Sequence, residues 1–229
     1  MFLYGYGPQL AEGLALTLQL ASLSLVLAFA LGLFSATASL SKSRIARICS
    51  ICYTTLIRGV PDLVTMLILF YGVQMLLNSL TESMEWGQIT INPFSAGVLT
   101  LGFIYGAYFS ETLRGAFIAV PKGSIEAAHA FGMRPRQVFV RILFPQMMRY
   151  ALPGIANNWQ VLLKSTALVS IIGLNDVVRV ANQAGKASSQ FFFFIGLSAL
   201  MYLAITTASQ LALRYLEKRY SHGVKMAAL

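Results

Sequence analysis

Residues 10–40 form a long apolar stretch that reads LAEGLALTLQLASLSLVLAFALGLFSATASL. They contain no lysine or arginine, and their one acidic residue, Glu12, lies near the beginning. A helix needs about 20 mostly apolar residues to cross a hydrocarbon layer of roughly 30 Å, so the stretch predicts a transmembrane helix. It lacks the basic start of a secretory signal, because no lysine or arginine precedes Lys42, and we expect it to remain as a span.

The composition of the whole chain agrees with a membrane protein. Of its 229 residues, 57% are hydrophobic and only 11% are charged, against about 25% charged in soluble domains. A soluble domain of this size could not bury so much apolar surface, which excludes a soluble enzyme, a disordered chain and a secreted disulfide scaffold. Cys49 and Cys52 form a lone CxxC without a second pair, so we expect two reduced thiols on a helix and no metal site.

Four further apolar stretches are long enough to cross the membrane. The fourth of the five is the most polar, and a hydrophilic loop precedes it. We therefore expect an all-α membrane protein with a single transmembrane domain over residues 1–229. Its five spans are expected at approximately 10–40, 63–80, 94–120, 152–174 and 191–213, with the hydrophilic loop at 121–150.

The basic residues predict how these spans are oriented. The net charge is +9, and cytoplasmic loops of membrane proteins are enriched in lysine and arginine. Fourteen of the 17 basic residues fall on one side of the predicted spans, which places the N-terminus outside and the C-terminus in the cytoplasm, and the charge requires no nucleic-acid partner. These residues are Lys42, Arg44, Arg47, Arg58, Arg114, Lys122, Arg134, Arg136, Arg141, Arg149, Arg214, Lys218, Arg219 and Lys225.

The cytoplasmic loop 121–150 is predicted to contain a short helix. Ser124 can cap its start, and Glu126 lies in the first turn, where the helix dipole favours negative charge. Gly132 is expected to end it. The two alanines after Glu126 give the helix a thin face that could enter a groove of another protein. From the residues alone, a docking helix and a plain linker between two spans both remain open.

The same loop resembles the EAA loop of ABC importer permeases. Glu126-Ala127-Ala128 is followed by Gly132 and then by Ile142-Leu143-Phe144-Pro145. In that family this loop is the coupling helix that docks onto the ATP-hydrolysing subunit. The resemblance implies that Glu126, Ala127, Ala128 and Gly132 couple this chain to a separate ATPase. No GxxxxGK[ST] phosphate loop occurs in the sequence, which agrees with an ATPase on another polypeptide.

Other stretches resemble the polar amino acid permeases of this family. They are Arg58-Gly59-Val60-Pro61, the run from Gly106 to Glu111, and Lys164-Ser165-Thr166-Ala167-Leu168. The similarity covers nearly the whole chain and is closest to the Q-type permease subunits of histidine/lysine/arginine/ornithine importers. One departure is Ser165, which stands where many relatives have aspartate, so this position supplies no substrate charge.

The resemblance implies a type I ABC importer (MetI-like) permease fold in the bacterial inner membrane. The chain would be a non-catalytic translocation subunit that imports polar amino acids and, from the closer resemblance, basic ones (arginine, lysine, ornithine, histidine) by alternating access. Expected partners are a second homologous permease, a dimer of ATP-binding subunits and an extracytoplasmic amino acid-binding protein. ATP and Mg would bind to the ATPase, and no cofactor is expected on this chain.

Three charged residues within or beside the predicted spans are candidates for the substrate pathway, because charges in a bilayer are costly. Glu111 could contact substrate or pair with Arg114, three residues further along the helix. Lys164 could meet a substrate carboxylate or pair with an acid on a neighbouring span. Asp62 could contact substrate, although an acid directly after Pro61 is more typical of a helix start.

The polar fourth span is expected to line a cavity, with Tyr105 and Tyr108 of the third span facing it. Its candidate residues are Asn158, Ser165 and Thr166. The alternative is that these groups hydrogen-bond between helices, as Ser, Thr and Asn do in membrane proteins. A rival function is a stand-alone secondary transporter or channel, which an odd number of spans without an inverted repeat disfavours.

Overall fold

A computed structural model describes residues 2–84, 87–88 and 90–220 of the chain. Lys225, one of the residues that predict the orientation, lies outside the described residues. The elements in chain order are η1 (Phe2–Gly5), α1 (Gly7–Leu40), α2 (Arg44–Gly59), α3 (Asp62–Ser83), α4 (Pro93–Ala119), α5 (Lys122–Ala130), α6 (Pro135–Val138), η2 (Phe139–Leu143), α7 (Phe144–Ser165), η3 (Thr166–Ile172), α8 (Val177–Ala187) and α9 (Phe191–Tyr220).

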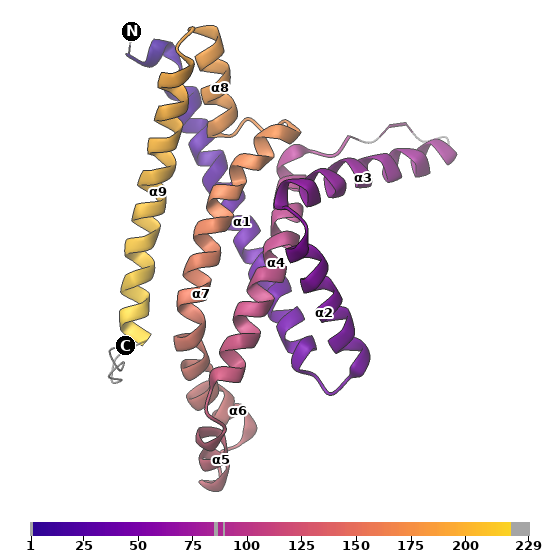
Figure 1. Ribbon diagram of the computed structural model, residues 1–229, viewed down its shortest axis with the longest axis vertical. Helices are drawn as coiled ribbons and strands as arrows, with labels where there is room; N and C mark the ends of the chain where they lie inside the picture. Colours follow the sequence, from indigo (N-terminus) through magenta and orange to yellow (C-terminus); the bar gives the residue numbers. More distant parts are fainter. Residues whose placement is uncertain (1, 85–86, 89, 221–229) are drawn as a thin grey trace.

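The four helices α1, α4, α7 and α9 run along the long axis of the molecule (Figure 1). One end of this bundle carries α5 and α6, and we call it the α5 end. The opposite end carries α8 and the N-terminal segment, and we call it the α8 end. Helix α3 leads away from the side of the bundle, and α2 joins it to the lower part of α1 (Figure 1).

The closest helix packing is between α1 and α4. A Cβ atom added to Gly102 would lie 2.5 Å from Leu27, and one added to Gly32 would lie 2.5 Å from Phe109. Both distances are far shorter than a carbon–carbon contact, so only glycine fits where the two backbones meet. Gly102, Gly106 and Ser110 recur every fourth residue and form a stripe of small residues on α4. This stripe packs within the chain, which is how such stripes bring membrane helices together.

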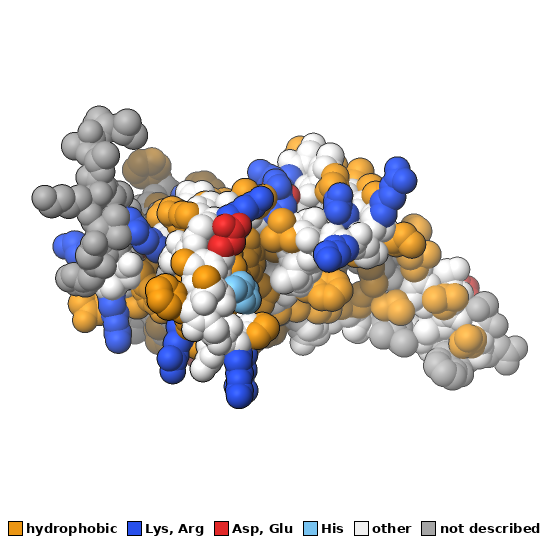
Figure 2. Space-filling view, turned by 90° about the horizontal axis from the view of Figure 1, so that it is seen from below, with side chains coloured by type: hydrophobic (Ala, Val, Ile, Leu, Met, Phe, Trp, Pro, Cys, Tyr) orange, Lys and Arg blue, Asp and Glu red, His pale blue; other side chains and the backbone are white. Residues whose placement is uncertain are grey.

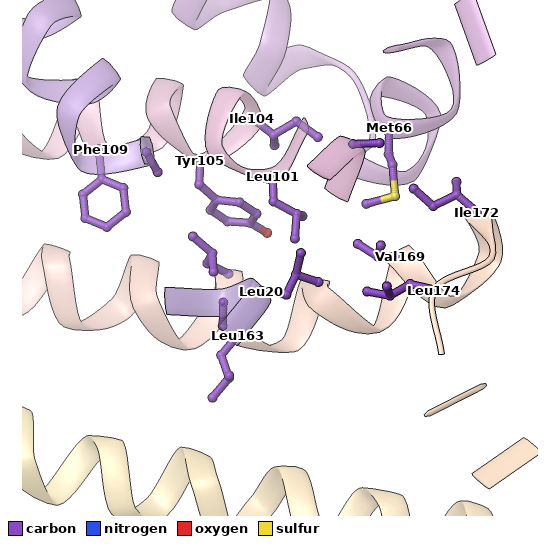
Figure 3. Close-up of a cluster of buried hydrophobic side chains, with 14 residues drawn as sticks. Leu20, Met66, Leu101, Ile104, Tyr105, Phe109, Leu163, Val169, Ile172 and Leu174 are labelled. Atoms are coloured by element: carbon purple, nitrogen blue, oxygen red, sulfur yellow. The ribbon is translucent and has the colours of Figure 1, made fainter. Parts of the chain in front are cut away.

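The main core lies where α1, α3, α4 and α7 converge (Figure 3). Leu20 of α1, Leu101 and Ile104 of α4, and Leu163 of α7 are fully buried in it. Tyr105 belongs to the same cluster, so its ring is packed among aliphatic side chains while its hydroxyl needs a polar partner. This requirement leads directly to the polar site described below.

Two further helices lie outside the predicted spans: α2, which carries Cys49 and Cys52 on a helix as expected, and α8, which was not expected. Helix α2 carries three arginines, and α8 is short and strongly amphipathic, so neither has the continuous apolar run of a span. The apolar face of α8 packs against α1 and α9, with Val177, Ala181 and Ala184 fully buried. A search for spans alone finds neither helix, because both derive their stability from one packed face.

The fourth predicted span also has different boundaries. Helix α7 begins at Phe144, eight residues before the expected start, and its α-helical winding ends at Ser165. The following residues, Thr166–Ile172, continue as a 3₁₀-helix that ends at Gly173, whose φ of 107° is favourable only for glycine. The span is therefore continuous in direction but changes its winding near its α8 end.

Length and hydropathy alone identify three helices of the described part that could cross a membrane: Gly7–Leu40, Asp62–Glu82 and Phe191–Tyr220. A fourth appears if the bent pair Pro135–Ile172 and Val177–Ala187 counts as one span. Helix α4 is not among them, although its 27 residues are about 40 Å long. Its many glycine, serine and tyrosine residues lower its hydropathy, because α4 is buried between α1 and α7.

Candidate substrate and coupling sites

Asp62 lies at the junction between α2 and α3. Helix α2 ends at Gly59, Val60 and Pro61 are extended, and Asp62 is the first residue of α3. The proline fixes this start, because it cannot continue α2 and its φ angle suits the beginning of a helix. The junction lies beside the middle of α4 (Figure 1), so the carboxylate of Asp62 reaches the tyrosines of that helix.

Two tyrosine hydroxyls of α4 donate hydrogen bonds to the Asp62 carboxylate. The Tyr105 hydroxyl is 2.8 Å from Oδ2 and the Tyr108 hydroxyl is 3.4 Å from Oδ1. The two rings are stacked, with centroids 5.4 Å apart. Asp62 is thus both the helix start that its neighbour Pro61 predicts and a member of a polar site.

The same site extends to α7 through Ser165. The Tyr105 and Ser165 hydroxyl oxygens are 2.5 Å apart. Because the single Tyr105 proton is donated to Asp62, Ser165 is the donor in this contact. We call Asp62, Tyr105, Tyr108 and Ser165 the Asp62 cluster. It joins α3, α4 and α7, and it brings together four of the residues that the sequence places on the substrate pathway.

The charge of Asp62 is not neutralised within the described part of the chain. The only ion pair there joins Glu111 and Arg114, whose closest atoms are 2.7 Å apart. Arg58 of α2 lies over the Tyr108 ring at 5.5 Å from its centroid, and it makes no ion pair with any described residue. A half-buried carboxylate held by two hydroxyl donors, without a basic partner, is suited to receive a cationic group from outside the chain.

Arg58 is a member of this neighbourhood that the sequence pattern did not indicate as a site residue. The sequence analysis used Arg58 only as one of the basic residues that predict the orientation of the spans in the membrane. Its position four residues before Asp62, with Tyr108 elsewhere in the chain, gives no local signal, because the cation–π contact depends on how α2 and α4 pack.

Lys164 is not brought into the Asp62 cluster. Its side chain is exposed on α7, and within the described residues it has neither an ion pair nor a hydrogen bond. The neighbouring Ser165, in contrast, contacts Tyr105. Lys164 is therefore available to a group outside this chain.

Asn158 and Thr166 connect helices rather than line the Asp62 cluster. The Asn158 side-chain amide donates to the Thr112 hydroxyl of α4 at 3.0 Å. The Thr166 hydroxyl contacts the Tyr202 hydroxyl of α9 at 3.0 Å. Both contacts match the interhelical hydrogen bonding that is the alternative to a pathway role for these residues.

The predicted coupling residues lie on and after α5, at the end of the bundle. The helix begins at Lys122, and Ser124 makes no capping hydrogen bond through its side chain, so the expected cap is wrong. Glu126 and Ala127 are exposed and Ala128 is buried. Gly132 has a φ of 74°, which terminates the helix as expected.

Phe131 is the most conspicuous residue of this end that the sequence pattern did not single out. Its side chain is 88% exposed, between the end of α5 and Gly132. An aromatic side chain so exposed at a membrane protein's hydrophilic end is typical of a contact surface. Adjacent exposed Ala127 and Phe131 give α5 an apolar face that faces away from the bundle.

Comparison with known proteins identifies the fold and the family. A family model described as "binding-protein-dependent transport system inner membrane component" matches residues 28–222. The chain belongs to this family. It is accordingly an inner-membrane permease subunit of the ABC importer class, and such subunits are not themselves the catalytic component.

Individual relatives match over almost their whole length. The chain is 58% identical to the histidine/lysine/arginine/ornithine transport system permease protein HisQ of Escherichia coli (strain K12), over 99% of this chain and 100% of the relative. It is 40% identical to the arginine ABC transporter permease protein ArtQ of Haemophilus influenzae, over 92% of this chain and 94% of the relative.

Solved structures show the same fold. A crystal structure of an amino acid ABC transporter with histidines matches with a TM-score of 0.79 and 29% identity, covering 93% of this chain and 95% of that one. An inward-facing MetNI methionine ABC transporter matches with a TM-score of 0.71 at 15% identity, over 95% and 98% of the two chains. The expected all-helical, MetI-like type I importer fold is confirmed.

Proposed function

We propose that this chain is the translocation subunit of an ATP-driven importer for basic amino acids, and that Asp62 receives the cationic side chain of the substrate. The observation that carries the proposal is the carboxylate of Asp62, which two tyrosine hydroxyls hold in place without a basic partner among the described residues. The named substrates of HisQ and the arginine of ArtQ support the same class of substrate.

The physical reason concerns the charge inside the bilayer. A carboxylate in a medium of low dielectric is costly unless a cation approaches it. A guanidinium or ammonium group of arginine, lysine or ornithine would neutralise Asp62, whereas a neutral side chain would not. The Asp62 cluster thus distinguishes basic from neutral amino acids through the charge of one residue.

The proposed topology has five spans: α1, α3, α4, α7 with η3, and α9. Helix α4 is included because it is long enough and runs from the upper part of the bundle to the α5 end, crossing α1 (Figure 1). The α5 end is assigned to the cytoplasm because lysine and arginine side chains gather over it, as Figure 2 shows from below. This assignment places the N-terminus outside and the C-terminus inside.

The proposed partners occupy different surfaces. Glu126, Ala127 and Gly132, together with the exposed Phe131, would contact one subunit of an ATPase dimer, which binds ATP and Mg. A second homologous permease would complete the pathway, and an extracytoplasmic binding protein would deliver the amino acid at the α8 end. In α9 only Phe194 and Ser198 are buried within the described chain, so most of that helix is available to lipid or to the second permease.

The proposed mechanism is alternating access. Closure of the ATPase dimer would displace α5, and α5 is attached to both α4 and α7, which supply three members of the Asp62 cluster. Movement of α4 against α3 would change the surroundings of Asp62. The conformational change can be driven only if ATP and substrate bind the two states with different affinities.

Reconstitution of the complete transporter tests the substrate class. Vesicles that contain this chain, its partner permease, the ATPase and the binding protein are expected to accumulate labelled arginine only with ATP. Unlabelled lysine, ornithine and histidine should compete, and glutamine should not. Accumulation by vesicles that contain this chain alone would establish the stand-alone transporter, and equal competition by glutamine would exclude specificity for basic amino acids.

Co-purification tests the coupling site. Gly132→Asp introduces a side chain where φ is 74° and is expected to reduce the ATPase recovered with the permease. Gly123→Asp is a matched control, because it adds the same charge to the same loop at a helical position with open space. Equal recovery with the two variants would show that the shape at Gly132 has no part in docking.

A further inference from the structure

A polar cavity of about 700 Å³ opens between α2 and α4, next to the Asp62 cluster. Three arginines line it, Arg47 and Arg58 from α2 and Arg114 from α4, and Glu111 is its one acidic residue. Ser39, near the end of α1, lines it as well. We call this space the arginine cavity.

One face of α2 forms a wall of the arginine cavity. Arg47, Thr55 and Arg58 are separated by eight and three residues, which places them on the same side of a helix. The eleven residues from Arg47 to Arg58 correspond to about 16 Å along the helix axis. The wall therefore has a guanidinium group at each end.

The two ends of the cavity have different neighbours. Arg58 lies over the ring of Tyr108, whose hydroxyl is bonded to Asp62, so this end adjoins the Asp62 cluster. Arg47 donates to the Ser41 carbonyl oxygen at 3.2 Å, in the turn that joins α1 to α2. That turn lies in the lower part of Figure 1, towards the α5 end. The cavity thus leads from the Asp62 cluster towards the proposed cytoplasmic side.

The arginine cavity has an excess of positive charge. Glu111 is paired with Arg114 at 2.7 Å, and within the described chain neither Arg47 nor Arg58 has a carboxylate partner. Arginine stays protonated at all physiological pH values. Two uncompensated guanidinium groups in one polar cavity attract an anion, and their forked donors suit a carboxylate or a phosphate.

We propose that the arginine cavity is an exit subsite for the α-carboxylate of the transported amino acid. The inference rests on the proposed function, in which Asp62 holds the cationic side chain. Arg58 then attracts the opposite end of the same zwitterion, and Arg47 attracts it further towards the cytoplasm. A lipid phosphate has the same binding chemistry, but the cavity adjoins a polar site and its lining includes one large aliphatic side chain, Ile51, so it offers little surface for acyl chains.

Charge-selective labelling of a thiol in the cavity tests this proposal in the complete, reconstituted transporter. Thr55→Cys places a thiol on the cavity wall, where Thr55 is exposed. Two methanethiosulfonate reagents of similar size, one with a sulfonate and one with a trimethylammonium group, are compared, with 2-mercaptoethanol as the reference thiol. Peptide mass spectrometry reads the introduced thiol separately from the native, exposed Cys49 and Cys52.

At the introduced thiol, the anionic reagent is expected to react several-fold faster, relative to the cationic one, than at the reference thiol. Arg47→Gln should reduce this preference. Arg44→Gln is the matched control, because it removes the same charge from the same helix at a position that does not line the cavity. A thiol without charge preference, an inaccessible thiol, or equal effects of the two substitutions would overturn the proposal.

Competition identifies the anion. Arginine is expected to slow labelling of the introduced thiol, and agmatine, which is arginine without its carboxylate, should slow it several-fold less at equal concentration. Equal protection by both would overturn the proposal. Protection by phosphatidylglycerol in the vesicles, compared with phosphatidylcholine alone, and no protection by arginine would assign the cavity to a lipid headgroup instead.

Uptake by the unmodified transporter in the same vesicles separates the two levels of inference. ATP-dependent arginine uptake without charge-selective labelling overturns the exit subsite and leaves the proposed function standing. Absence of arginine uptake, with the complete set of subunits present, overturns the proposed function and with it the assignment of the cavity to the substrate.

Discussion

Two polar clusters lie along α4. They differ in whether their own residues meet all their needs for hydrogen bonds and for charge neutralisation. The serine cluster joins Ser110 to Ser35 of α1 at 2.9 Å, and Ser35 to Ser50 of α2 at 2.8 Å. All three serines are buried and uncharged, and their hydrogen bonds stay within the group and the adjacent backbone. In the Asp62 cluster the charged residue, Asp62, is only half-buried, and the cluster adjoins an open cavity.

This difference between the two clusters distinguishes polar groups that stabilise a membrane helix bundle from polar groups that bind a ligand. Hydroxyl groups that bond to each other hold helices together and need nothing from outside. A carboxylate held by hydroxyls alone is oriented, but its charge is not neutralised. It therefore needs a cationic ligand to neutralise it. We expect substitutions in the serine cluster to affect stability, and substitutions in the Asp62 cluster to affect transport.

The largest effect is expected for Asp62→Asn. The amide keeps an oxygen for the tyrosine hydroxyls but cannot neutralise a cationic side chain, and hydrogen bonds to charged groups contribute about 1.5–3 kcal/mol. Arginine uptake by the complete transporter should therefore fall about 10- to 100-fold. The amount of assembled complex, measured by size-exclusion chromatography, should be unchanged.

Glu12→Gln is the control for this substitution, because Glu12 is an exposed acid on α1 outside the Asp62 cluster. It should leave arginine uptake within about twofold of the wild type, the range of a surface charge. Equal loss of uptake in both variants would remove the distinction between the two clusters.

A smaller effect is expected for Asp176→Asn, which extends the comparison to a buried charge without access to a ligand. Asp176 is 0% exposed, Oδ1 accepts from the Arg179 backbone N–H at 3.0 Å, and within the described residues Oδ2 has no hydrogen-bond partner. Burial raises the pKa of this carboxyl to about 6. It lies in the connection before α8, outside the proposed spans.

The sign of the pH dependence follows from this raised pKa. The folded protein holds the proton more tightly, so the stability from Asp176 is full below its ordinary pKa of 3.8 and is lost as pH rises to about 6. Asparagine keeps the helix cap without the charge. At pH 7 the variant should be more stable by about 3 kcal/mol, and the difference in thermal unfolding should shrink towards pH 4. A difference independent of pH would contradict a buried, charged Asp176.

The next effect distinguishes the two tyrosines of the Asp62 cluster. Tyr105→Phe removes a 2.8 Å hydrogen bond to Asp62 and the contact with Ser165, whereas Tyr108→Phe removes a bond of 3.4 Å. A net hydrogen bond of about 1 kcal/mol corresponds to roughly fivefold in affinity. The KM for arginine should rise about fivefold in the first variant and less than twofold in the second. The reverse order would assign the anchoring role to Tyr108.

The smallest effect is expected for Ser110→Ala in the serine cluster. Hydrogen bonds between membrane helices average about 0.6 kcal/mol, so the melting temperature of the complex should fall slightly. Arginine uptake should stay at the wild-type rate. Loss of uptake at unchanged melting temperature would place Ser110 on the substrate pathway.

The sequence predicted the long apolar elements well, because their hydropathy is a local property. The helical character of α1 and α9 and the loop that contains α5 follow from runs of neighbouring residues. Helix α8 was not predicted, and α2 was expected only as a helix around Cys49 and Cys52, since each is stabilised by packing of one face against other helices. The expected stretch 94–120, by contrast, coincides closely with α4, which runs from Pro93 to Ala119.

The site was predicted as a set of residues but not as an arrangement. Asp62, Tyr105 and Ser165 were each proposed, yet their contact joins residues 43 and 60 positions apart. The junction before α3 brings Asp62 to Tyr105, and the packing of α7 on α4 brings Ser165 there. Lys164 was also proposed, but its side chain is exposed on α7, outside the contact that Ser165 makes with Tyr105. The periodicity of a sequence assigns a residue to one face of its helix. Which residues that face contacts depends on how the helices pack together.

The change of winding after α7 has a consequence for the height of the molecule. A 3₁₀-helix rises about 2.0 Å per residue against 1.5 Å in an α-helix, so Thr166–Ile172 extends roughly 3.5 Å further than the same residues would in α winding. That extra reach brings the Val177 backbone N–H level with the Thr17 hydroxyl, 3.3 Å away, and sets its chain against Gly13. The rise of this seven-residue 3₁₀-helix thus determines where the beginning of α8 contacts α1.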